Sequence, residues 1–161
     1  MTTATDALAR GIESAMRLTL MMTEDLKGSD WLHRPCAGAN CAAWTVGHLV
    51  ITSRMMMSKA GGGDLPALPD GFEKRFARDE SAPKAADFGD VSNLRELFQQ
   101  HHERFAAFVK SFPVDKLDTV IADHRAFRTI GELFAFAAVH ISMHAGQIST
   151  IRRSLGRPPL V

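Results

Sequence analysis

Residues 130–155 read IGELFAFAAVHISMHAGQISTIRRSL, and this stretch decides the fold. Its apolar residues recur three and four positions apart, which predicts one amphipathic helix of roughly 39 Å that ends before Gly156. His140 and His144 are four positions apart, so both project toward the apolar face. Burying an unpaired ring nitrogen costs on the order of 1–3 kcal/mol, so each imidazole needs a partner. A divalent metal would serve both rings, and hydrogen bonds within the core are the alternative.

A third histidine lies on another predicted helix. His48 belongs to the apolar stripe of a helix expected over residues 41–59, with Asn40 before it as the side-chain cap. If the two helices are neighbours, His48, His140 and His144 form a tripod of ring nitrogens. Three protein ligands leave a position for water or substrate, whereas structural zinc sites usually have four ligands. Imidazoles suit zinc, nickel, iron or copper, and an all-nitrogen set does not choose among them.

Two more helices complete a predicted all-α four-helix bundle. Apolar periodicity places them over residues 6–26 and 91–112. The connection over residues 61–90 contains prolines and has no sustained period, so we expect a long loop that covers a site or lies on the surface. Phe72 and Phe76 are four positions apart and predict a short helical turn within it. A connection this long allows the chain to cross over the bundle.

Other polar residues receive structural explanations. His101 and His102 straddle the edge of an apolar stripe, so one of them should face outward, and we assign His101 no metal role. His124 is expected in a solvated loop. Thr129 and Glu132 predict a capping box, in which the Glu132 side chain reaches back to the cap.

Gln147 follows His144 by three positions and lies either beside the open metal position or on an ordinary helix flank. Arg152 and Arg153 lie in the last turns of the helix, where the helix dipole favours basic residues. A contact with the carboxylate of a cofactor is the weaker interpretation. No catalytic residue can be assigned.

Composition restricts the function further. The 161 residues suffice for one domain over residues 1–161, and a net charge of +1 gives no support for nucleic-acid binding. No basic leader or apolar run long enough for a membrane span is present, so we expect a cytoplasmic protein without a membrane partner. The two cysteines, Cys36 and Cys41, are too few for a four-sulfur zinc site and are expected to be reduced.

Two short motifs carry a resemblance to a known family. Residues 40–49, NCAAWTVGHL, and residues 140–148, HISMHAGQI, resemble the DinB/YfiT-like superfamily of bacterial proteins. The resemblance implies a bundle of up-down-down-up order, commonly a homodimer, in which His48, His140 and His144 bind a divalent metal. Zinc or nickel is expected, with iron as the alternative.

The same resemblance implies chemistry of two kinds. Some members are transferases or isomerases that use a low-molecular-weight thiol such as bacillithiol, mycothiol or glutathione, and others are described only as metal-dependent hydrolases. We therefore expect a metal-dependent enzyme acting on a small substrate, with a thiol as cosubstrate. The alternative is a non-catalytic bundle that the metal stabilises, or a dimerisation module.

Overall fold

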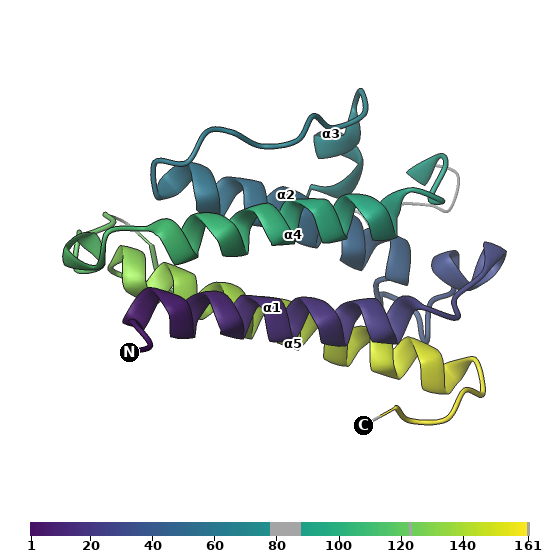
Figure 1. The fold of residues 1–161 in the computed structure, drawn as a ribbon. Helices are drawn as coiled ribbons and strands as arrows, with labels where there is room; N and C mark the ends of the chain where they lie inside the picture. Colours follow the sequence, from purple (N-terminus) through teal and green to yellow (C-terminus); the bar gives the residue numbers. More distant parts are fainter. Residues whose placement is uncertain (78–87, 123, 161) are drawn as a thin grey trace.

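Four long helices form the molecule in the computed structural model, which describes residues 1–77, 88–122 and 124–160. They are α1 (Ala4–Thr23), α2 (Ala42–Lys59), α4 (Leu94–Ser111) and α5 (Ile130–Ser154). Helices α1 and α5 run one way and α2 and α4 the other, which is the up-down-down-up order (Figure 1). No strand is present among these described residues, so the predicted all-helical class is confirmed.

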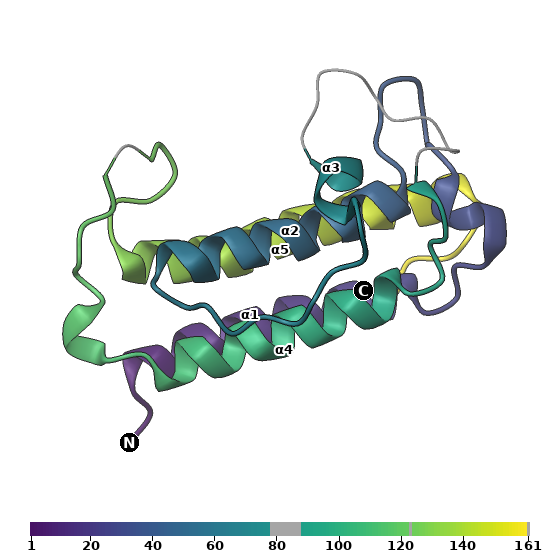
Figure 2. The same ribbon diagram turned by 90° about the horizontal axis from the view of Figure 1, so that it is seen from above.

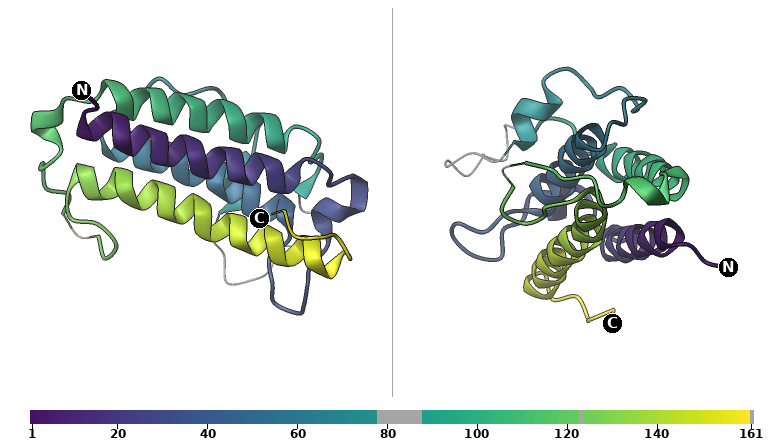
Figure 3. Two further views of the ribbon diagram at one scale, coloured as in Figure 1. Left: turned by 60° about the horizontal axis from the view of Figure 1, so that its bottom comes forward. Right: turned by 90° about the vertical axis from the view of Figure 1, so that its left-hand side faces the viewer.

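The helices surround a common core. Helix α1 packs against α4 and α5, and α2 packs against the same two helices from the other side. Seen from its end, the bundle has each helix facing a shared interior (Figure 3). The largest fully buried side chains come from every one of these helices, and they include Ile12, Leu49, Phe98, Phe105, Leu133 and Ile148. Helices α2 and α5 are therefore neighbours, as the tripod requires.

A long crossover makes the parallel arrangement of α2 and α4 possible. The chain leaves α2 and runs back along the bundle to α3 (Phe72–Phe76) before entering α4 (Figure 2). Phe72 and Phe76 are both buried, with ring centroids 4.5 Å apart, so the predicted helical turn is confirmed. Residues 78–87 of the expected loop lie outside the described residues. Among the described residues, short 3₁₀ helices lie in other connections at Gly28–Leu32 and Val114–Lys116.

Gly47 fixes the position of α3 on α2. A Cβ atom at Gly47 would lie 2.3 Å from Cδ1 of the Phe76 ring, which is far inside van der Waals contact. The missing side chain therefore opens the place on α2 into which Phe76 packs. Phe88 also stacks on that ring, with centroids 5.6 Å apart. Helix α3 is thus held beside His48, the residue that follows Gly47.

Two predicted caps differ from those observed. Helix α2 begins after Cys41, which makes no side-chain cap, so the prediction that Asn40 caps this helix is wrong. At α5 the Thr129 hydroxyl accepts a hydrogen bond from the Glu132 backbone N–H, as predicted. The Glu132 carboxylate accepts from the N–H of Arg128 and not from that of the cap residue, at 2.6 Å. Both side chains still satisfy backbone donors at the helix start.

A charged cluster joins the ends of α1 and α5. Arg152 is 2% exposed, and its guanidinium donates to the Met22 carbonyl and to the Asp25 carboxylate. Arg157 adds an ion pair with Asp25 at 2.7 Å and one with Asp30 at 2.6 Å. Arg152 therefore has structural partners in Met22 near the end of α1 and in Asp25 just after it. Within the described part of the chain, no helix has the length and apolarity to cross a membrane.

Candidate metal centre

Three histidines from two helices meet at one side of the core. His48 comes from α2, and His140 and His144 come from successive turns of α5. Each ring offers a nitrogen, and these atoms all lie within 4.8 Å of one another. The Nε2 atoms of His140 and His144 are 3.2 Å apart. Two nitrogens about 2.0–2.1 Å from a tetrahedral zinc ion are roughly 3.3 Å apart, so this pair already has the spacing of metal ligands.

Neighbouring side chains orient the three rings. His144 Nδ1 donates to the Gln147 side-chain oxygen at 2.9 Å, which leaves the lone pair of Nε2 directed at the other histidines. Trp44 stacks on His48 with centroids 4.6 Å apart and planes only 8° apart. Phe136 stacks on His140 at 5.7 Å. Such outer contacts fix ring tautomer and direction in metal sites, so the donor set fits a divalent metal.

Burial favours the neutral form of the two rings on α5. Burial, together with the nearby His144 and His48 rings, lowers the pKa of His140 to about 4. Burial also lowers the pKa of His144, against the opposing effect of the hydrogen bond to Gln147. Only the unprotonated nitrogen can bind a metal, so these histidines need not lose a charge-bearing proton before they act as ligands.

The tripod opens into a cavity of about 490 Å³. His124 is among its lining residues and is half-buried, so the prediction that it is solvated is wrong. Its ring stacks on Phe127 with centroids 3.6 Å apart, and its Nδ1 accepts from the Ala126 N–H at 3.2 Å. Asn40 lines the same cavity instead of capping α2. No carboxylate occurs among the described lining residues, which are Asn40, Trp44, His48, Thr52, Met55, Met56, His124, Phe127, Phe136, His140, Met143, His144 and Gln147.

His101 and His102 lie outside this group of three. Both are buried, at 0% and 1% exposure, so the prediction that one faces outward is wrong. His102 Nδ1 donates to the Phe98 carbonyl at 2.8 Å, whereas both ring nitrogens of His101 are buried without a hydrogen-bond partner in the described structure. Burial lowers the pKa of each ring to about 4, so both are neutral core residues.

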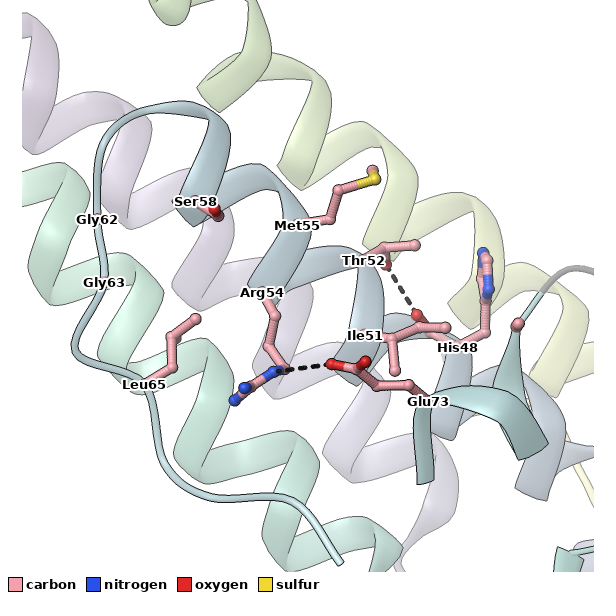
Figure 4. Close-up of a pocket in the computed structure, with 11 residues that line it drawn as sticks. His48, Ile51, Thr52, Arg54, Met55, Ser58, Gly62, Gly63, Leu65 and Glu73 are labelled. Carbon is pink, nitrogen blue, oxygen red and sulfur yellow. Dashed lines mark hydrogen bonds and ion pairs between the residues drawn. The ribbon is translucent and has the colours of Figure 1, made fainter. Parts of the chain in front are cut away.

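A second cavity, of about 770 Å³, lies between α2, the segment that follows it and α3 (Figure 4). It shares His48, Thr52 and Met55 with the first cavity, so these three residues form the ridge between the two. Arg54 and Glu73 bring opposite charges to it, with Arg54 Nε 3.8 Å from a Glu73 oxygen. The sequence analysis did not single out this pair, because Glu73 reaches α2 only through the docking of α3.

The two cysteines form no disulfide and lie in different environments. Cys36 is exposed, and Cys41 is fully buried at the start of α2. Burial raises the pKa of the Cys41 thiol, which keeps it protonated and unreactive at neutral pH. Neither belongs to the group of residues that converge on the candidate metal centre.

Comparison with known proteins identifies the family. The model of the DinB superfamily matches residues 12–148, a span that includes α2, α4 and all three histidines. No curated protein and no solved structure matched the chain. The match covers most of the sequence, and the converging histidines fit a metal-binding protein of this kind. The chain belongs to the DinB superfamily.

Proposed function

We propose that the protein is a metal-dependent enzyme in which His48, His140 and His144 hold one divalent ion, zinc or nickel first and iron as the alternative. The observation that carries the proposal is the convergence of three histidine ring nitrogens at the wall of an open cavity. A structural site would be closed by a fourth protein ligand, whereas three ligands leave room for a substrate atom. The 490 Å³ cavity is large enough for a small molecule to approach that position.

The lining of the cavity favours a thiol as the nucleophile. A bound divalent metal stabilises the thiolate form of a thiol and also lowers the pKa of water. Hydrolysis further requires a group that protonates the leaving atom, and the described lining offers no carboxylate for that task. Transfer of a thiol to an electrophilic carbon places a smaller demand on the protein. His124 is the titratable lining residue outside the tripod that can carry a proton in either reaction.

The rival proposal is a non-catalytic bundle in which the metal stabilises the fold or a dimer. The absence of a carboxylate from the described lining of the first cavity is also compatible with this rival. A metal that only stabilises the fold needs no general acid or base beside it. Under the rival, metal removal lowers the melting temperature and no substrate is turned over. A homodimer is a prediction common to both proposals, and light scattering of the purified protein measures it directly.

Metal content of the purified protein, compared with that of His144→Ala, is the first test. We expect about one equivalent of metal in the wild-type protein and a sharp loss in the variant, because the variant removes one of three ligands. His33→Ala is the matched control, since His33 pairs with Ser154 away from the tripod. Equal metal content in wild type and variant would contradict the ligand assignment.

A second measurement separates enzyme from structural site. Cobalt in place of the native metal gives a charge-transfer absorption when a thiolate binds, so titration with simple thiols reports whether the open position is accessible. Thiol-dependent consumption of an electrophile by the zinc or nickel form would then establish transfer. Metal that binds without any response to thiols or any turnover would favour the structural rival.

A further inference from the structure

The second cavity extends from the candidate metal ligand His48 along α2 and includes a cation, Arg54. His48, Thr52 and Met55 stand on one side of α2 and border both cavities, so a ligand can pass from the tripod over this ridge. Beyond the ridge, Ile51 and Leu65 make an apolar wall. Arg54 lies further along α2 in the middle of the cavity, with its side chain directed toward Glu73 (Figure 4).

The contacts of the Arg54 guanidinium fix its position but leave its Nε side weakly paired. One nitrogen, Nη1, donates to the Pro66 carbonyl at 2.6 Å, which fixes the side chain under the crossover. Its partner Glu73 is a weak one, because the closest approach is 3.8 Å and the Glu73 side chain is 74% exposed. Exposed ion pairs of this kind contribute little stability. A better-placed carboxylate can therefore take over the Nε side of Arg54 while Glu73 turns into solvent.

We propose that this cavity binds the carboxylate end of an extended, largely apolar substrate, with Arg54 as the anchor and Glu73 as the group that the carboxylate displaces. The inference rests on the proposed function for what happens at the other end of the ligand, where the reacting group meets the three histidines. It assigns a ligand class to a cavity that the tripod chemistry does not use. A planar carboxylate matches the guanidinium fork better than a point charge would.

The helix sets a minimum length for such a ligand. Arg54 follows His48 by six positions on α2, and a rise of 1.5 Å per residue separates them by about 9 Å along the axis. The two side chains also leave α2 about 120° apart around the axis, so a chain of roughly five to seven carbon atoms is the shortest that covers this separation. The wall contributed by Ile51 and Leu65 is apolar, so the middle of the ligand should be hydrocarbon and not sugar or phosphate.

Helix α3 explains how the fold builds this site. The Phe76 ring packs where Gly47 lacks a side chain, and Glu73 lies one helical turn before it on the same short helix. The position of Glu73 relative to Arg54 is thus set by a contact one residue from His48. Both cavities consequently share one rigid element, helix α2, which lines them with His48, Thr52 and Met55.

The test compares two thiols of equal chain length, mercaptohexanoate and mercaptohexanol, by calorimetry on the zinc-loaded protein. Hydrogen bonds to charged groups predict about a ten- to hundredfold preference of the wild type for the carboxylate. Arg54→Gln should reduce this preference to within about twofold, and Glu73→Gln should raise affinity for the carboxylate about two- to fivefold by removing the competitor. Arg17→Gln, at an exposed arginine on α1, is the matched control.

The opposite signs expected for the two variants exclude a merely structural role for Arg54. Equal affinity of the wild type for both thiols, or a preference that survives Arg54→Gln, would overturn the inference and leave the proposed function intact. The finding that the protein binds no metal would instead contradict the proposed function. In that case hexanoate and hexanol on the metal-free protein decide the inference: a preference for hexanoate that depends on Arg54 supports it, and equal binding overturns it.

Discussion

Replacing Gln147 with Leu should weaken metal binding without unfolding the protein. The Gln147 oxygen accepts the Nδ1–H of His144 at 2.9 Å and so selects the tautomer whose Nε2 faces His140. Loss of comparable outer contacts costs 10–100-fold in metal affinity. Gln147 is exposed, so water can replace part of the bond, and we expect the lower end, about tenfold or 1.4 kcal/mol. Gln147→Glu should instead tighten binding, because a carboxylate is a stronger acceptor.

Competition with a chromogenic chelator measures zinc affinity for this comparison, and circular dichroism checks that the helices persist. Gln100→Leu is the matched control, since Gln100 is an exposed glutamine on α4 bonded to Glu96. Affinity of Gln147→Leu within about twofold of the wild type would refute the reasoning that this bond sets the His144 tautomer. A decrease for Gln147→Glu would refute it as well.

Two further predictions concern stability. Gly47→Ala should lower the free energy of unfolding, measured by urea denaturation, by about 1–3 kcal/mol, because the new Cβ overlaps the buried Phe76 ring. In the double variant, Phe76→Leu should recover part of this loss. Unchanged stability of Gly47→Ala would show that α3 does not dock at this position. The Arg152 and Arg157 guanidiniums hold the pKa of Asp25 at about 2, below its ordinary 3.8. That stabilisation is present above about pH 4 and is lost as the pH falls through 2. Because the Asp25 side chain is half exposed, the ion pairs are worth about 1 kcal/mol. Asp25→Asn should remove this part of the acid dependence of unfolding, and an unchanged pH profile in the variant would contradict the contribution of the ion pairs.

The long helices were predictable because their signal is local. In α5 the apolar spacing, the Thr129 cap and Gly156 after the last turn all lie within the segment that they define. The predicted bounds differ from the observed ones by a few residues, as at α4, which begins at Leu94 and not at 91. Those differences arise because helix ends depend on caps and loop contacts more than on periodicity.

The roles of individual polar side chains were less predictable. His124 was expected in solvent, yet it stacks on Phe127 at the cavity wall, and that contact depends on how the loop before α5 folds back. His101 and His102 are both buried because α4 faces two helices, α1 and α2, and therefore has a wider buried face than a single stripe. Periodicity gives the direction of a side chain but not the width of the surface that neighbouring helices cover.

The sequence by itself determined the helices, the common face of His140 and His144, and the presence of His48 on a second apolar stripe, because each follows from spacing along one helix. Only the tertiary structure decided that α2 and α5 are neighbours, that Gln147 accepts from His144, and that α3 brings Glu73 to Arg54. These features join residues from different elements or depend on one rotamer. Their positions follow from packing in the folded state, which no local pattern in the chain encodes.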